Sequence, residues 1–282
     1  MMEPLADAYT AEEQFRLASV LLVCYPKVGS TWLQTMIAQY LDARYGAKAK
    51  SVKQMFLRTL QVKGMEPTLR THDDDPHAKP VPVFEQDKSH YREKKVILLV
   101  RDPRDVVVSY YFWVTHGREV DWPLEPFRGT IDEFVHSPVG GLRTVIAFYN
   151  IWAHNRHVPR EFMLVRYEEL RTHAFAQMCR VLAFLGEAKP SVSHLEKIIE
   201  FGKFDNMRGL EDENVPGLTR PAHIHSGEYE GYKVRRGVVG GYVDYLRPKT
   251  IEEMDRVIAA ELSDEFRFYY KQKNPAYAGG LS

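Results

Sequence analysis

One short stretch of the sequence, residues 25–32, combines the residue types that bind anions. It reads Tyr-Pro-Lys-Val-Gly-Ser-Thr-Trp and follows an apolar run of strand length. Lys27 supplies a positive charge, Gly29 lets a ligand approach the backbone closely, and Ser30 and Thr31 supply hydroxyl donors. The stretch is not a Walker A sequence, because its lysine precedes the glycine. It predicts an anion site at a strand-to-helix turn, although an ordinary turn of this kind is the alternative.

A second strand-turn-helix lies further along the chain. The apolar residues 96–100 are followed by Arg-Asp-Pro-Arg-Asp, in which Asp102 is a good N-cap and Pro103 suits the first helical position. Arg101 stands at the carboxyl end of the strand, where open α/β sheets bind their ligands, and Ser109 lies two helical turns further on. The pair predicts a second anion contact. The alternative is that Arg101 only pairs with Asp102 or Asp105.

A third basic element occurs near the C-terminal end. Arg235 and Arg236 are adjacent and are followed by Gly237. Guanidinium groups bind phosphate through paired hydrogen bonds, so these residues predict a clamp on a phosphate. A solvated basic loop is the alternative.

His72 is the candidate base, and it has three interpretations. It follows Arg70 and Thr71 at the end of a short predicted strand and precedes three aspartates. It could be a surface histidine, a metal ligand together with His77 and the aspartates, or a general base. Neutral imidazole suits removal of a hydroxyl proton near neutral pH.

These residues need a scaffold, and the hydrophobic pattern predicts one. Apolar strands are expected near 20–24, 96–100 and 162–165, and a short strand that ends in a polar turn is expected near 69–72. Amphipathic helices are expected between and after them. This order predicts an α/β fold, namely a single domain over residues 1–282 with a central, mostly parallel sheet flanked by helices. The segment 208–231 is polar with little periodicity and is expected to be irregular, and residues 205–236 are expected to form a lid.

Composition narrows the functional classes. The formal net charge is zero, which argues against a nucleic-acid partner, and no apolar run approaches the roughly 18 residues of a membrane span. Cys24 and Cys179 are the two cysteines, and both are expected to be buried thiols of a reducing compartment. The N-terminal residues lack a secretory pattern. A cytoplasmic location is therefore expected, and the sequence predicts no particular oligomeric state.

The loop at Lys27 resembles the P-loop-like phosphosulfate-binding loop of the sulfotransferases that use 3'-phosphoadenosine 5'-phosphosulfate (PAPS). The Arg101–Ser109 run resembles the family element that holds the 3'-phosphate, and the resemblance covers roughly residues 18 to 242 by ordered motifs. It implies PAPS as cosubstrate, 3',5'-ADP as product, and no metal. The cosubstrate-binding residues that it implies are Lys27, Val28, Gly29, Ser30, Thr31, Trp32, Arg101, Ser109, Tyr167, Phe204, Met207, Arg235, Arg236 and Gly237.

The resemblance also implies three catalytic roles. Lys27 would stabilise the oxygen that leaves the sulfuryl group, His72 would take the proton of the acceptor, and Arg70 would steady the sulfuryl oxygens. The sequence departs from the family at Arg70, which replaces a lysine, and at Gly241 and Tyr242, which replace aspartate and tryptophan.

The predicted function is therefore in-line transfer of a sulfuryl group from PAPS to a hydroxyl acceptor. Aromatic and apolar residues within 52–65 and 113–134 suggest a small, partly hydrophobic alcohol or phenol. A P-loop-type nucleotide kinase and a catalytically silent binding module on the same scaffold are the two alternatives.

Overall fold

The computed structural model describes residues 9–116, 127–213, 215–216, 218 and 235–270 of the 282-residue chain. Most of the predicted lid, 205–236, lies outside these residues, as does the side chain of Phe204. The part of it that is described begins with a helix, α10 (Phe204–Asp212). The polar composition had predicted irregular chain from Arg208 onward, so that expectation is wrong for residues 208–212.

A four-stranded, fully parallel sheet forms the centre of the described molecule. Its strands are β1 (Val20–Cys24), β2 (Thr68–Thr71), β3 (Lys95–Val100) and β4 (Glu161–Arg166), in the order β2-β1-β3-β4. Every residue of β1 and β3 is buried, as expected for central strands covered on both faces. The predicted α/β fold with a parallel sheet is confirmed.

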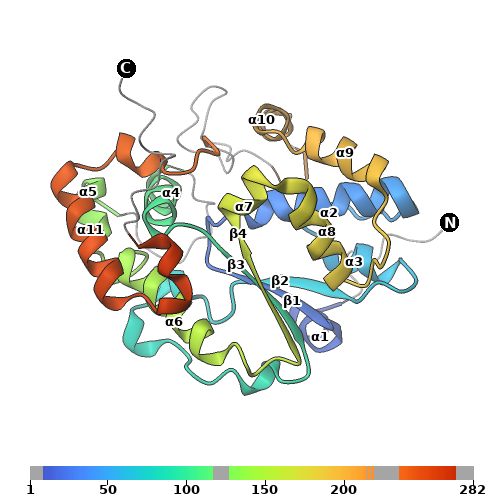
Figure 1. The fold of residues 1–282 in the computed structure, drawn as a ribbon, viewed down its shortest axis with the longest axis horizontal. Helices are drawn as coiled ribbons and strands as arrows, with labels where there is room; N and C mark the ends of the chain where they lie inside the picture. Colours follow the sequence, from blue (N-terminus) through green and yellow to red (C-terminus); the bar gives the residue numbers. More distant parts are fainter. Residues whose placement is uncertain (1–8, 117–126, 214, 217, 219–234, 271–282) are drawn as a thin grey trace.

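Helices cover the sheet on both sides (Figure 1). In this view α2, α3, α8 and α9 lie to the right of the strands and α4, α5, α6 and α11 lie to the left. The α-helices are α1 (Ala11–Leu17), α2 (Ser30–Tyr45), α3 (Met55–Leu60), α4 (Pro103–Thr115), α5 (Ile131–Val135), α6 (Leu142–Asn155), α7 (Tyr167–Thr172), α8 (Ala174–Phe184), α9 (Val192–Phe201), α10 and α11 (Pro248–Glu261). Short 3-10 helices are η2 (Pro76–Ala78), η3 (Val81–Val83), η4 (Ser89–Tyr91), η6 (Gly241–Asp244) and η7 (Asp264–Tyr269).

The register of the sheet places four chain segments at one edge. Thr71 of β2 pairs with Val23 of β1, so the residues that follow these strands leave the sheet side by side. On the other side of β1, Cys24 pairs with Leu99 of β3. Because all four strands are parallel, the loops after Cys24, Thr71, Val100 and Arg166 meet at the carboxyl edge, where such sheets bind ligands.

One expectation about the cysteines is wrong. Cys24 is buried in the core, but Cys179 on α8 is only partly buried, because it packs at the margin of the hydrophobic core rather than inside it. The two thiols therefore do not share one environment. Within the described residues, no helix is long and apolar enough to cross a membrane.

Candidate active site

The loop between β1 and α2 bends sharply to deliver its residues to the carboxyl edge. Lys27 adopts φ +71° and Gly29 adopts φ +94°, both in the left-handed region. For a lysine this conformation costs about 1 kcal/mol or more, and strained residues of this kind cluster at ligand sites. Helix α2 begins at Ser30 directly after Gly29, so its unpaired backbone N–H groups point toward this loop.

A single cleft collects three segments that are far apart in the sequence. The loop at Lys27, the start of α4 at Arg101 and the basic segment at Arg235 all line it. Of the predicted cosubstrate-binding residues whose side chains are described, all line this cleft except Val28, whose side chain is buried in the core. The lining residues that were not among the predicted cosubstrate-binding residues are Asp105, Arg171, Gly202, Val238 and Gly241.

Arg101 connects all three segments. Its Nη1 donates to the carbonyl of Lys27 (3.4 Å), and its Nη2 donates to the carbonyl of Val238 (2.9 Å). Nη2 also lies 3.4 Å from the carboxylate of Asp105, so the pairing that was the alternative interpretation does occur. It occurs within the cleft and leaves Nε of Arg101 buried with no hydrogen-bond partner among the described residues. A buried donor without an acceptor is costly, so this group suits an anionic ligand.

Asp105 positions the far wall of the cleft. Its carboxylate accepts hydrogen bonds from the backbone N–H groups of Gly240 (2.8 Å) and Tyr242 (3.1 Å). Burial raises the pKa of Asp105, and the charge of Arg101 opposes that rise. The sequence suggested Asp105 only as a possible partner of Arg101 and gave no sign of its contacts with Gly240 and Tyr242. Its spacing of four residues from Arg101 was the one signal that could have identified it.

Arg235 lies against two aromatic rings. Its guanidinium group is 4.4 Å from the centroid of Phe112 and 4.7 Å from that of Tyr245, and its Nη1 donates to the Tyr245 hydroxyl (2.5 Å). Its Nε is buried and has no partner among the described residues, like that of Arg101. Arg236 instead pairs with Asp244 (2.7 Å) at a more exposed position. The rings fix Arg235 in place, which suits a clamp on an anion.

Aromatic rings form the other end of the cleft. Tyr167 lies between Arg101, at 4.5 Å, and Trp32, at 5.8 Å and an interplanar angle of 69°. The indole N–H of Trp32 donates to the carbonyl of Gly202 (2.7 Å), and this fixes the ring. Arg171 lies 5.5 Å from the Trp32 ring. Fixed aromatic rings of this kind suit a nucleotide base, which can stack on a ring face.

His72 lies next to the loop rather than in the lining of the cleft. Its Nδ1 is 2.8 Å from the carbonyl of Cys24, which can only accept, so Nδ1 carries the hydrogen. Nε2 is then the acceptor, and the guanidinium Nη1 of Arg70 donates to it. Burial, followed by the charge of Arg70, holds the pKa of His72 well below its usual range. The imidazole is therefore neutral, as a base must be.

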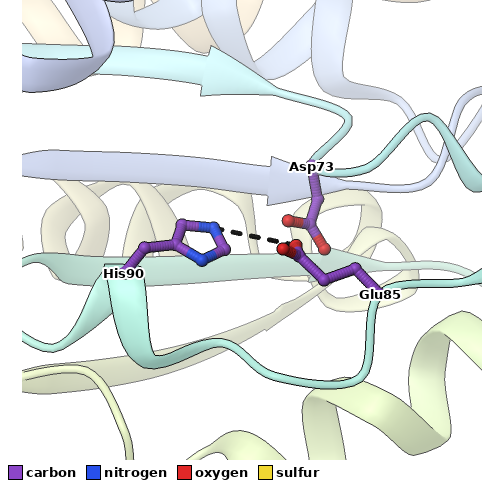
Figure 2. Close-up of side chains that lie close together, drawn as sticks. All are labelled: Asp73, Glu85 and His90. Atoms are coloured by element: carbon purple, nitrogen blue, oxygen red, sulfur yellow. Dashed lines mark ion pairs between the residues drawn. The ribbon is translucent and has the colours of Figure 1, made fainter.

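The described residues contain one group of side chains that could hold a metal ion, namely Asp73, Glu85 and His90 (Figure 2), whose ligand atoms all lie within 4.8 Å of one another. The ammonium group of Lys88 lies 2.8 Å from Asp73 and 3.3 Å from Glu85. Asp73 also accepts from the Tyr91 hydroxyl (2.7 Å). Lysine therefore already supplies the positive charge in this group, which is an ion-pair network and carries no argument for a metal.

Comparison of the sequence with known proteins identifies similar proteins of one family. A sequence model of the sulfotransferase domain matches residues 17–266. Flavonol 3-sulfotransferase of Flaveria bidentis is 24% identical over 267 residues, covering 86% of this chain and 81% of that protein. Cytosolic sulfotransferase 13 of Arabidopsis thaliana is 26% identical and covers 91% and 81%, and sulfotransferase 1B1 of Mus musculus is 22% identical and covers 89% and 85%.

Solved structures share the fold. Mouse sulfotransferase SULT7A1 complexed with PAP superimposes with a TM-score of 0.62 at 21% identity, covering 93% of this chain and 90% of that one. Retinol dehydratase in complex with androsterone and inactive cofactor PAP gives a TM-score of 0.61 at 16% identity and covers 91% and 82%. At this level of identity the likeness establishes the fold.

Proposed function

The chain belongs to the sulfotransferase domain family, and from this premise we propose that it transfers the sulfuryl group of PAPS to a hydroxyl acceptor, with His72 as general base. The observation that carries the proposal is the convergence of Lys27, Arg101 and Arg235 on one cleft. Two buried guanidinium N–H groups in that cleft have no acceptor among the described residues, and they fit a ligand that brings phosphate oxygens.

The cleft offers separate places for the two phosphates of PAPS. The start of α2, with Ser30 and Thr31, would hold the 5'-phosphate. Arg101, Ser109 and residues 235–237 would hold the 3'-phosphate, and Tyr167 and Trp32 would contact the adenine. Asp105 would act indirectly, because its carboxylate holds Gly240 and Tyr242 in place.

PAPS supplies an activated sulfuryl group, and the chain's residues position it and absorb charge. Lys27 would stabilise the bridging oxygen as that oxygen leaves with 3',5'-ADP. His72 Nε2 would accept the hydroxyl proton as the acceptor oxygen bonds to sulfur. The hydrogen bond from Nδ1 to the carbonyl of Cys24 sets the tautomer that this role requires. Arg70 would steady the sulfuryl oxygens once it leaves Nε2.

The acceptor is proposed to be a small molecule with an alcohol or phenol group. The relatives include a protein named flavonol 3-sulfotransferase, and a structural neighbour was solved with androsterone. Both names are consistent with an acceptor of this size.

The family assignment sets aside the nucleotide kinase hypothesis. The silent binding module is tested by assaying transfer of labelled sulfuryl to a panel of hydroxyl acceptors.

The Arg101→Ala variant tests the assignment of the 3'-phosphate site. Loss of a charged hydrogen bond costs about 1.5–3 kcal/mol, so 3',5'-ADP should bind roughly 10- to 100-fold more weakly while 5'-AMP binds almost unchanged. Calorimetry with both nucleotides measures this difference. Arg171→Ala is the matched control, because Arg171 lies against Trp32 at the other end of the cleft and should weaken both nucleotides alike. Equal losses in Arg101→Ala would remove Arg101 from this role.

The His72→Ala variant tests the general base. Loss of such a base lowers turnover by about 10²- to 10⁴-fold. Binding of 3',5'-ADP should persist, because His72 does not line the cleft. Single-turnover transfer from PAPS, measured beside 3',5'-ADP binding, separates the two effects. Full turnover by the variant, under conditions where the chemical step limits the rate, would show that His72 is not the base.

A further inference from the structure

We propose that the acceptor carries an oxyanion near its hydroxyl group, and that Arg70 and Lys53 bind this oxyanion beside His72. The inference rests on the proposed function and narrows its substrate class. It starts from a second cavity, separate from the cosubstrate cleft, that shares Arg70 with the catalytic base.

The second cavity has the polarity of an anion site. Its volume is about 190 Å³, which exceeds the roughly 150 Å³ that accommodates a benzene ring. Among the residues that the structure describes, two cations, two carboxamides and three apolar side chains line it, and no acidic residue does. The lining residues are Gln14, Lys53, Gln54, Phe56, Leu57, Leu69 and Arg70. A molecule with an aromatic or aliphatic group and a negative charge would contact both the apolar and the cationic side chains of this lining.

Arg70 connects this cavity to the catalytic base. Its side chain lines the cavity, and its guanidinium Nη1 donates to Nε2 of His72. Lys53 lines the same cavity as Arg70, and its charge also acts on His72. A molecule with its hydroxyl group at Nε2 therefore has these two cations within its reach.

Arg70 forms no ion pair with a carboxylate, in contrast to three buried cations of the described residues. Arg58 pairs with Asp42 (2.8 Å), Lys88 with Asp73 (2.8 Å) and Arg104 with Asp102 (2.8 Å). Among the described residues no carboxylate forms an ion pair with Arg70. The charge of Arg70 acts on exposed Asp75, but only across a longer distance. A partly buried, unpaired guanidinium group is stabilised by an incoming anion.

Binding of an anionic acceptor by Arg70 would also free Nε2 of His72 from its hydrogen bond with Arg70. While Arg70 donates to Nε2, the lone pair that must accept the hydroxyl proton is occupied. An oxyanion is a stronger acceptor for guanidinium than a neutral imidazole nitrogen, and it can bind both ends of the guanidinium fork. An anionic acceptor therefore draws Arg70 away from Nε2, whereas a neutral or cationic one leaves it there.

The test uses four compounds with one ring and one phenol: 4-hydroxyphenylacetate, its primary amide, tyramine and 4-hydroxybenzylphosphonate. Their binding to the enzyme saturated with 3',5'-ADP is measured by calorimetry, and their sulfuryl transfer from PAPS is measured separately. We expect the carboxylate to bind at least tenfold more tightly than the amide and tyramine to bind most weakly. The phosphonate shows whether a tetrahedral oxyanion is preferred to a planar one.

Two variants locate the effect. Lys53→Glu should reverse the order, so that tyramine binds more tightly than the carboxylate, while the affinity for 3',5'-ADP stays within about twofold. Lys48→Glu is the matched control, because Lys48 lies outside the cavity lining, and it should keep the wild-type order. Equal binding of carboxylate and amide, or an unchanged order in Lys53→Glu, overturns the inference. The proposed function fails instead if 3',5'-ADP binds to the wild type no better than 5'-AMP. Calorimetry with the two nucleotides measures this separately from acceptor binding.

Discussion

At the scale of single residues, burial and then the charge of Arg70 set the chemistry of His72. The imidazole is held neutral by burial and by this neighbouring guanidinium group, and the carbonyl of Cys24 fixes its tautomer. A base with a lowered pKa stays unprotonated well below neutral pH. Activity should therefore be lost on acidification only below the usual pKa range of histidine.

The Arg70→Gln variant tests this dependence. Removing the positive charge should raise the pKa of His72, so the acid limb of the kcat/KM profile should move to higher pH. Because burial is the larger cause, the limb should still lie below the ordinary value of 6.5. Arg70→Lys keeps the charge and should leave the limb almost in place. An acid limb at the same pH in Arg70→Gln and in the wild type would contradict the electrostatic coupling.

The sequence predicts the basic residues of the cleft better than it predicts the residues that hold the cleft in shape. Lys27, Arg101 and Arg235 could be chosen from sequence because basic residues beside glycines or strand ends have few other uses. Asp105 could not, because its role depends on backbone N–H groups more than a hundred residues away. Arg171 likewise matters only through its contact with the Trp32 ring. Such roles arise from packing and leave no local pattern.

At the scale of elements, the turn from β1 into α2 depends on Gly29. A Cβ atom added there would lie 2.5 Å from Cδ2 of Tyr167, and the residue also adopts φ +94°. The glycine thus allows both the turn and the close approach of the ring that lines the cleft. The conformation of the loop and the position of the Tyr167 ring therefore both depend on Gly29.

The Gly29→Ala variant should both destabilise the fold and weaken nucleotide binding. Gly46→Ala is the matched control, because Gly46 also has a positive φ (+67°) but nothing lies within 4 Å of an added Cβ. Both variants should lose about 1 kcal/mol of unfolding free energy from backbone strain. Only Gly29→Ala should also displace Tyr167 and weaken 3',5'-ADP binding, by about tenfold or more. Urea unfolding and calorimetry measure the two effects, and equal affinity for 3',5'-ADP in both variants would argue against the coupling.

The elements themselves were largely predictable because their signals are local. The apolar runs of β1 and β3 and the Asp102-Pro103 start of α4 appear in the structure where the pattern placed them. Helix α10 was missed because its composition is polar overall, although its few apolar residues fall on one face. The lid remains a prediction.

At the scale of the whole molecule, parallel pairing makes four separate loops into one site. It also buries titratable groups that the chemistry does not use directly. His77 follows β2, is 4% exposed and lies against the rings of Tyr25 and Tyr110. Burial, and then the charge of Arg70, lower its pKa from 6.5 to about 4. Such a group makes the stability of the whole domain depend on pH.

The stability of the domain should fall as pH falls from about 6.5 toward 4. In this window the unfolded chain binds a proton at His77 and the folded chain does not, so acidification favours unfolding. A shift of this size corresponds to about 2.5 kcal/mol lost by pH 4.5. Urea unfolding of the wild type and of His77→Gln between pH 7 and 4.5 measures the contribution. His72 still contributes to the slope in the variant, so the variant should lose stability less steeply rather than not at all. Identical slopes in the two proteins would mean that His77 accepts its proton in the folded state, with a pKa near the ordinary value.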